Sequence, residues 1–191
     1  MIKYRKEEIE KVKEDLLSGK IIAFPTDTVF GLGCVYDNDE AIERIYEAKN
    51  RSISKKLPMM VSDTNMLKDY AKMNDCAKKL FDKYTPGPLT IILEYKDSND
   101  TVAIRIPKDE WIIELIKKMN KPLLVTSANI SGTESLIKYE NVINQLDGRV
   151  DGIVLDDAKG DVASTIVNMV GEIKIIRNGP ISEKDIFDTL K

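Results

Sequence analysis

The first fifty residues switch between apolar residues at helical spacing and short extended segments. Between Lys6 and Ser18 apolar residues recur at helical spacing, and Gly19 follows where a glycine often ends a helix. Residues 21–24 are apolar throughout and predict a buried strand, and residues 31–35 predict a second one. Helical spacing returns at 39–49, so helices and strands are interleaved from the start.

The remaining chain continues this alternation. Strands are predicted at 59–61, 89–94, 101–106, 123–126, 152–155, 165–169 and 173–177. Helices are predicted at 65–72, 75–83, 111–119 and 139–146, and from Glu183 onward. Several strands follow one another with no room for the crossover helix that a purely parallel sheet requires. We therefore expect a single-domain α/β (α+β) protein over residues 1–191, with a twisted mixed parallel/antiparallel sheet flanked by helices.

The charge balance bears on the partners of the protein. Lys and Arg total 29 against 32 for Asp and Glu, so the net charge is slightly negative. Proteins whose main task is to bind nucleic acid usually carry a net basic face, so this balance argues mildly against tight RNA binding.

Histidine is absent from the sequence. This excludes a histidine general base, a Ser-His-Asp or Cys-His nucleophile system and any metal site with histidine ligands. An enzyme with this sequence must work with Lys, Arg, carboxylates, hydroxyls, amides and backbone N–H groups.

Cysteine usage and the N-terminal segment indicate the compartment. Cys34 and Cys76 lie far apart and form neither a CxxC pair nor a zinc-binding spacing, so we expect both to be packing residues. The N-terminal segment is charged and lacks the apolar stretch of a signal peptide, and no apolar run reaches the length of a membrane span. We expect a cytoplasmic protein with no membrane partner.

Two segments near the N-terminus offer polar groups for a ligand. In the segment 25–33 Thr26 and Thr28 supply hydroxyls and the glycines allow close approach to the backbone. Taken alone, the segment is better explained as a simple turn between two strands with a local bond from Asp27. Lys49, Arg51 and Lys55, with Lys56 beside them, suit phosphates. Their position at a helix end is also explained by the helix dipole and by solvation.

An arginine on a predicted strand is a further candidate for ligand binding. Strand alternation places Arg105 beside Ala103 and opposite Val102, Ile104 and Ile106. Such an arginine suits a cavity with an anionic occupant, or an ion pair across the sheet.

Two later loops repeat this polar pattern. The segment 126–132 follows an apolar strand and carries Ser127 and Asn129, so it could bind phosphate or only cap a helix. Ser164 precedes another strand. Arg177 shares the predicted face of Ile173 and Ile175, and its partner could be a phosphate or the carboxylate of Asp156 or Asp157.

The order of these motifs resembles that of the YrdC-domain family, the threonylcarbamoyl-AMP synthases. PTDTVFGLG is followed by KxRxxxK, YxPGPLT, TVAIRIP, TSANISG, STIV and IIRNG, and the resemblance spans Val12 to Ser182. The chain departs from the family pattern at Thr85, Lys56 and Asn168. Its end soon after Arg177 resembles the short, single-domain form of the family.

The resemblance implies a mixed sheet around a large central concave cavity and a nucleotidyltransferase activity. L-threonine, bicarbonate and ATP would give threonylcarbamoyl-AMP and pyrophosphate, with Mg²⁺ accompanying ATP. The catalytic and phosphate-binding residues would be Lys49, Arg51 and Lys55; Ser127, Asn129, Ser164 and Arg177 would complete the ATP site; Thr26, Thr28 and Arg105 would hold threonine.

The product would then pass to a tRNA threonylcarbamoyl transferase complex for threonylcarbamoyladenosine modification of tRNA, with weak or no direct tRNA binding by this chain. Three alternatives remain open at this point. They are an RNA-binding module without adenylating turnover, a carbamoyl-adenylate enzyme of hydrogenase maturation, and a regulatory ATP-binding protein.

Overall fold

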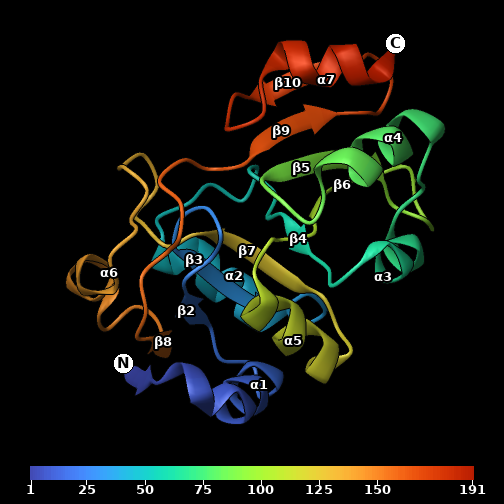
Figure 1. The fold of residues 1–191 in the computed structure, drawn as a ribbon. Coiled ribbons are helices and arrows are strands. Elements are labelled where there is room, and N and C mark those ends of the chain that lie inside the picture. Colours follow the sequence, from blue (N-terminus) through green and yellow to red (C-terminus); the bar gives the residue numbers. More distant parts are fainter.

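Ten strands hydrogen-bond into one sheet in the computed structural model, which describes residues 1–191 (Figure 1). They are β1 (Ile2–Tyr4), β2 (Ile22–Phe24), β3 (Gly31–Val35), β4 (Met59–Met60), β5 (Leu89–Glu94), β6 (Thr101–Arg105), β7 (Leu123–Ser127), β8 (Gly152–Val154), β9 (Thr165–Asn168) and β10 (Lys174–Arg177). Their order across the sheet is β1-β8-β2-β3-β7-β4-β6-β5-β9-β10. Neighbours pair parallel at β1–β8, β8–β2, β4–β6 and β5–β9 and antiparallel elsewhere, which confirms the predicted mixed sheet.

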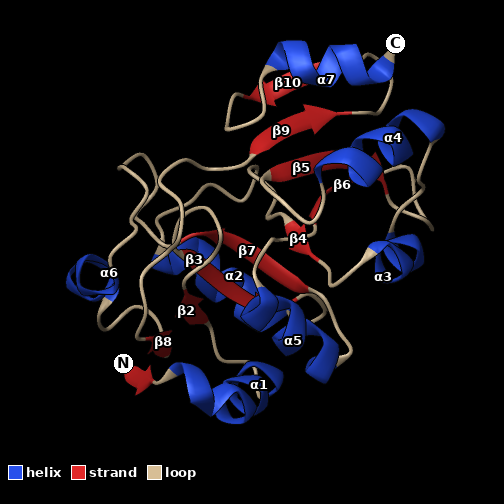
Figure 2. Ribbon diagram, in the orientation of Figure 1, coloured by secondary structure: helices blue, strands red, loops and turns tan.

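Seven helices flank this sheet (Figure 2). They are α1 (Ile9–Leu17), α2 (Asp39–Ala48), α3 (Thr64–Tyr70), α4 (Asp75–Tyr84), α5 (Glu110–Met119), α6 (Tyr139–Leu146) and α7 (Glu183–Leu190). Helices α1 and α5 share one apolar cluster with β2, β7 and β8, whereas the other five pack into a second, larger cluster. None of the helices is long and apolar enough to cross a membrane.

Local sequence signals explain where helices begin and end. The Oδ1 atom of Asn38 accepts a hydrogen bond from the backbone N–H of Ala41 at 2.9 Å and so caps α2. Gly19 follows α1 with φ of +91°, a backbone conformation that glycine adopts without strain.

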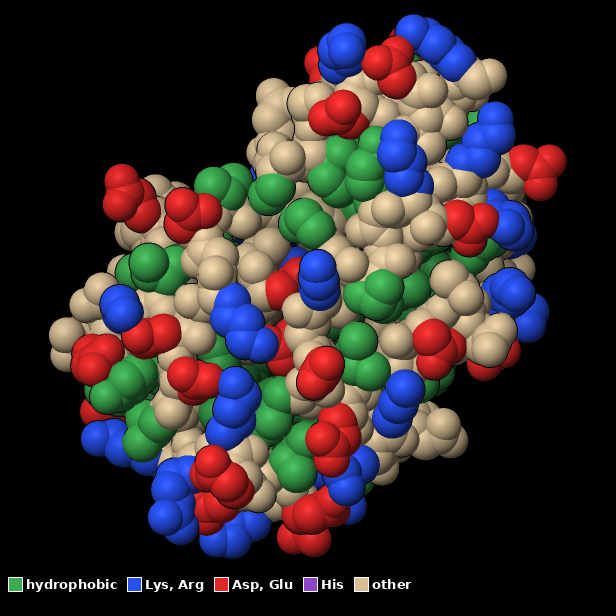
Figure 3. All heavy atoms as spheres, in the orientation of Figure 1, with side chains coloured by type: hydrophobic (Ala, Val, Ile, Leu, Met, Phe, Trp, Pro, Cys, Tyr) green, Lys and Arg blue, Asp and Glu red, His purple; other side chains and the backbone are tan.

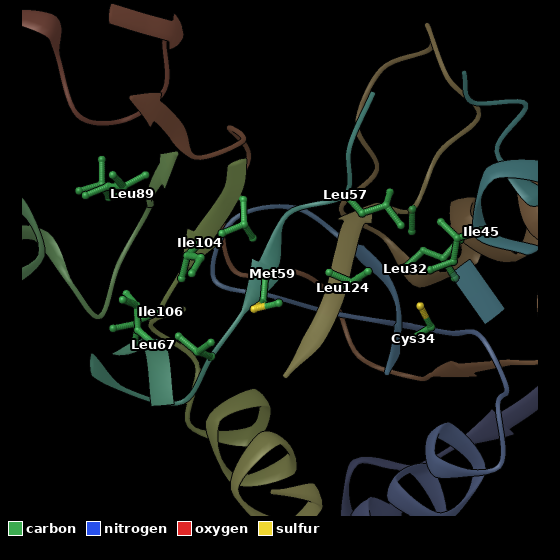
Figure 4. Packing of buried hydrophobic residues seen from close by; sticks show 14 of the residues in the cluster. Leu32, Cys34, Ile45, Leu57, Met59, Leu67, Leu89, Ile104, Ile106 and Leu124 are labelled. Atoms are coloured by element: carbon green, nitrogen blue, oxygen red, sulfur yellow. The ribbon is translucent and has the colours of Figure 1, made fainter. Parts of the chain in front are cut away.

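The larger cluster fills the space between the sheet and α2, α3, α4, α6 and α7. Figure 4 shows Leu32 of β3, Leu124 of β7 and Ile45 of α2 meeting there. Both cysteines belong to this packing and neither forms a disulfide, Cys34 being buried and Cys76 half-buried. Burial raises the pKa of Cys34 to about 12, so its thiol stays protonated and packs as an apolar group.

Alternation along β5 and β6 gives these strands two different faces. Ile91 and Ile104 belong to the larger cluster, whereas Thr90, Ala103 and Arg105 point to the opposite face. No helix contributes a residue to that opposite face along β5, β6 and β9. The uncovered part of the sheet therefore leaves room for a cavity.

Candidate functional site

A cavity of about 490 Å³ lies on the uncovered face of the sheet. Its polar wall consists of Thr26, Thr28, Arg51, Ser54, Lys56, Thr90, Thr101, Arg105, Thr126, Ser127, Ser164 and Arg177. Seven of the predicted site residues are in this wall, namely Thr26, Thr28, Arg51, Arg105, Ser127, Ser164 and Arg177. The sheet thus gathers residues from segments that are far apart in the sequence.

Arg105 lies at the end of β6, is only 5% exposed and faces the cavity as strand alternation predicted. Its Nη2 donates to Oδ1 of Asp27 at 2.7 Å, its Nη1 to Oγ1 of Thr28 at 2.8 Å, and its Nε to the carbonyl oxygen of Gly87 at 3.2 Å. Arg105 therefore lines the cavity and also forms an ion pair, with a carboxylate from the loop after β2 and not from a neighbouring strand. An anionic occupant beside it stays a prediction. Three of the five guanidinium protons are used, so two remain for a ligand.

The hydroxyls of Thr26 and Thr28 form one buried network. The Thr26 hydroxyl donates to the carbonyl oxygen of Val29 at 2.7 Å and accepts from the backbone N–H of Thr28 at 3.0 Å. The two hydroxyl oxygens are 3.0 Å apart. Since Thr26 has already used its only proton, Thr28 donates to Thr26 and accepts from Arg105. The local turn bond expected from Asp27 is made by Thr26 instead.

A second arginine enters the cavity from β10. Arg177 donates from Nε to the carbonyl oxygen of Ser164 at 2.9 Å and from Nη2 to its hydroxyl at 3.0 Å. Ser164 also shares a 2.8 Å hydrogen bond with the hydroxyl of Thr90, which pairs with Arg105 across β5 and β6. Thr90 and Ser164 therefore lie between the two arginines on the cavity face of the sheet.

The predicted face of Arg177 is wrong. A register shift lies between Ile175, which pairs with Val167, and Arg177, which pairs with Ile166. This bulge turns Ile176 and Arg177 toward the cavity, while Ile175 packs against the core. The carboxylates proposed as partners of Arg177 are engaged elsewhere, Asp156 with Lys6 and Asp157 with Lys138, each at 2.6 Å.

The loop after α2 supplies the third arginine. Arg51 donates from Nε to the carbonyl oxygen of Lys55 at 3.0 Å and from Nη2 to that of Lys56 at 3.2 Å. The side chains of Arg51 and Lys56 line the cavity, whereas Lys55 is exposed and outside its wall. Lys56, a departure from the family pattern, pairs with Asp100 at the cavity rim.

Lys49 and Asn129 also lie outside the cavity wall. Lys49 is 1% exposed, and its ammonium donates to the carbonyl oxygens of Ser127 and Asn129. The Asn129 amide donates to the carbonyl oxygens of Ile130 and Thr133, at 3.0 and 2.9 Å. Lys49 and Asn129 thus contact the loop behind Ser127, and their direct contact with a nucleotide stays a prediction.

Three arginines make the cavity electropositive, and they lie close enough to repel one another. Burial lowers the pKa of Arg177, and the positive charges of Arg105 and Arg51 lower it further. Burial also lowers the pKa of Arg51 and of Arg105, although Asp27 opposes this effect at Arg105. An anionic ligand would relieve this repulsion, since it compensates charges that are costly to bury unpaired.

One contact that the sequence pattern did not reveal involves the segment 158–163. A Cβ atom on Gly160 would lie 2.7 Å from the carbonyl oxygens of Asp27 and Thr28, so only glycine allows this close approach. Lys159 donates from its backbone N–H to the carbonyl oxygen of Thr26 at 2.9 Å, and its ammonium pairs with Asp109 at 2.8 Å. The segment therefore braces the loop that carries the cavity threonines.

The other departures from the family pattern lie away from the cavity. The Thr85 hydroxyl donates to the carbonyl oxygen of Phe81 at the end of α4, and the Asn168 amide donates to the carbonyl oxygens of Val170 and Glu172. Both make local structural bonds and leave the cavity wall unchanged.

Charges on one face of the molecule are mixed rather than segregated. Figure 3 shows basic and acidic side chains interspersed over the face drawn there, with apolar patches between them. This face therefore lacks the extended basic patch that a long nucleic acid would need. The chain has no cluster of three or more His, Cys, Asp or Glu side chains that could hold a metal ion.

A mixed sheet with a concave, arginine-lined cavity is suited to binding a polyanionic small molecule. Residues 14–179 match the family Sua5_yciO_yrdC, described as "Telomere recombination". A protein of Methanocaldococcus jannaschii is 38% identical over 185 residues, which are 93% of this chain and 88% of that protein. The chain therefore belongs to the Sua5/YciO/YrdC family, as its motifs predicted.

The chain covers different shares of its other relatives. The threonylcarbamoyl-AMP synthase of Bacillus subtilis is 36% identical over 183 residues, 90% of this chain and 53% of that enzyme. The crystal structure of P. abyssi Sua5 complexed with L-threonine has a TM-score of 0.90 at 29% identity, over 98% of this chain and 59% of that one. E. coli YciO has the same fold, with a TM-score of 0.87 at 24% identity over 97% of each chain. The predicted fold class is confirmed.

Proposed function

We propose that this chain is a threonylcarbamoyl-AMP synthase that forms threonylcarbamoyl-AMP and pyrophosphate from L-threonine, bicarbonate and ATP. The observation that carries the proposal is that one cavity combines Arg105 beside two threonine hydroxyls with Arg177 beside Ser164. The first group suits the carboxylate and polar groups of an amino acid, and the second suits phosphate oxygens. The B. subtilis relative carries this activity in its name.

The threonine end of the site is formed by Arg105 with Thr26 and Thr28. Arg105 retains two guanidinium protons that can bind a carboxylate, in addition to its bond to Asp27. Thr28 has donated its proton to Thr26, so its remaining lone pair accepts a hydrogen bond from the amine or hydroxyl of the substrate. The P. abyssi relative was crystallised with L-threonine.

The nucleotide end is formed by Arg51, Arg177, Ser127 and Ser164. Arg51 must give up bonds to the carbonyl groups of its own loop before its planar donors can bind phosphates. Mg²⁺ would accompany ATP, whose phosphate oxygens would supply ligands to it, so it would need few ligands from the protein. Positive charge from the arginines stabilises the negative charge that develops during phosphoryl chemistry.

The reaction needs no strong protein base. The threonine ammonium and bicarbonate form a carbamate, one ammonium proton leaves in the water derived from bicarbonate, and a second is released. A carbamate oxygen then attacks the α-phosphorus of ATP as the bond to the β-phosphate oxygen breaks, which releases pyrophosphate. Since the carbamate is already anionic, positioning and cationic stabilisation suffice, and a chain without histidine can supply both.

Isotope labelling tests the proposal. With carbon-13 bicarbonate, ATP, Mg²⁺ and threonine, the label should appear in a product that mass spectrometry identifies as threonylcarbamoyl-AMP. Conversion of ATP without label in an adenylate product would refute the proposal. In the cell the product would pass to a tRNA threonylcarbamoyl transferase complex, and this step belongs to the proposal as well.

A further inference from the structure

Lys49 is a buried cation without a carboxylate partner. It follows α2 directly, and its side chain is 1% exposed. Its ammonium donates to the carbonyl oxygens of Ser127 and Asn129, the latter at 2.5 Å, and no acidic group pairs with it. A methionine would fill a similar volume without the cost of burying a charge, so the ammonium must contribute something beyond packing.

The backbone of Lys49 also holds the same segment. Its carbonyl oxygen accepts from the backbone N–H of Ser131 at 2.8 Å. Lys49 therefore contacts the segment 127–131 at three points, with donors at one end and an acceptor at the other. The segment connects β7 to the loop beyond it, and Ser127 at its start lines the cavity.

Two side-chain oxygen atoms in this segment lack hydrogen bonds. Oδ1 of Asn129 and Oγ of Ser131 are buried and have no hydrogen-bond partner. Burying these atoms without partners destabilises the observed conformation, because they form hydrogen bonds with water in the unfolded chain. The two hydrogen bonds from the Lys49 amino group to backbone carbonyl oxygens can offset this cost.

We infer that Lys49 is a positioning residue, which holds the segment 127–131 against the end of α2 so that Ser127 faces the cavity. Lys49 thus acts on the nucleotide through Ser127 and the neighbouring backbone, not by touching a phosphate. This inference rests on the proposed function for its kinetic consequence, although the structural contact can be tested without any turnover.

Amide hydrogen exchange tests the contact. In Lys49→Met the amides of Asn129 and Ser131 should exchange at least about tenfold faster than in the unmodified protein. Arg51→Met removes the adjacent cation from the cavity wall and should leave both rates within about twofold. If Lys49→Met does not fold, Lys49→Gln retains an amide donor and should give intermediate rates. Unchanged exchange in whichever of these Lys49 variants folds would overturn the inference.

A double-mutant cycle tests the kinetic consequence. Ser127→Ala should lower kcat/KM for ATP by about tenfold in the unmodified enzyme but by less than about threefold in the Lys49→Met background, because the serine is then already misplaced. The KM for threonine should change far less than the KM for ATP in the same variants. Additive effects would mean that Lys49 contacts the nucleotide independently. If the unmodified enzyme shows no turnover, the proposed function fails while the exchange result still decides whether Lys49 holds the segment.

Discussion

Arg105 and Asp27 form an ion pair in the wall of the cavity, with Nη2 of the arginine 2.7 Å from Oδ1 of the aspartate. Their side chains are 5% and 9% exposed, so the pair is almost fully removed from water. Asp27 therefore compensates the guanidinium charge before any ligand binds. A substrate carboxylate adds to this pair through the two free guanidinium protons, so Asp27 also fixes the orientation in which the arginine receives it.

Replacing Arg105 should impair threonine binding selectively. Arg105→Ala removes two charge-assisted hydrogen bonds, each contributing about 1.5–3 kcal/mol, so threonine should bind at least about tenfold more weakly. Arg105→Lys keeps the charge but loses the planar donors and should restore affinity only in part. Isothermal titration with threonine and with ATP measures both effects, and ATP affinity should change far less. Normal threonine binding by Arg105→Ala would place the amino-acid site elsewhere.

The cations after α2 should not contribute equally to ATP binding. Arg51 lines the cavity, whereas Lys55 is exposed outside its wall. Arg51→Ala should weaken ATP binding at least about tenfold, since charge-assisted bonds of about 1.5–3 kcal/mol are lost. Lys55→Ala, the matched control, should cost less than about threefold. Titration of both variants with ATP checks this order, and a larger effect at Lys55 would show that the loop rearranges around the nucleotide.

The local pattern of apolar and polar residues was sufficient to predict most of the strands and helices. The residues predicted for β3, β5 and α6 are the residues that form these elements. The strand β1 was missed, because its three residues become a strand only by pairing with β8, where Ile2 lies beside Gly152. Such pairing brings together distant parts of the chain, and no local periodicity encodes it.

Only part of the site could be predicted, because contacts between distant segments leave no local pattern in the sequence. Strand alternation placed Arg105 in the cavity, but it misplaced Arg177 because a bulge inserts one residue and reverses the alternation. The burial of Lys49 depends on the loop after β7 folding over its ammonium. The helix-end position of this lysine suggested a solvated or phosphate-binding side chain, since sequence alone does not show what packs on it.

The titration of Lys49 should make stability depend on pH. Burial lowers the pKa of Lys49 from 10.5 to about 7, and the positive charge of Arg51 adds to this effect. The folded protein therefore binds fewer protons than the unfolded chain between about pH 7 and pH 10.5, so its free energy of unfolding rises with pH in this window. The slope due to this group approaches about 1.4 kcal/mol per pH unit.

Urea unfolding of the unmodified protein and of Lys49→Met across this range isolates the contribution of Lys49. The difference in unfolding free energy between the two proteins should shift in favour of the unmodified protein as pH increases. Parallel curves would mean that the ammonium keeps its ordinary proton affinity in the fold.

Replacing Gly160 should weaken the threonine site. Its Cβ in Gly160→Ala would lie 2.7 Å from two carbonyl oxygens of the Asp27–Thr28 backbone, so the segment 158–163 must move away. We expect a lower melting temperature and about tenfold weaker threonine binding, as for a misplaced binding loop. Gly171→Ala is the control, because Gly171 has a φ of +67° and open space around its Cβ position. It should cost about 1 kcal/mol of stability through backbone strain and leave threonine affinity unchanged. Equal threonine affinities of Gly160→Ala and Gly171→Ala would show that the segment 158–163 does not support the threonine site.

Pyrophosphate release from ATP tests the central claim most directly. The complete mixture contains the enzyme, ATP, Mg²⁺, threonine and bicarbonate, and each of the last two is omitted in turn, with dissolved carbon dioxide removed in the latter case. The cavity combines an amino-acid end with a phosphate end, so release should require threonine and bicarbonate together and should proceed without tRNA. Release at the same rate without threonine would contradict the account.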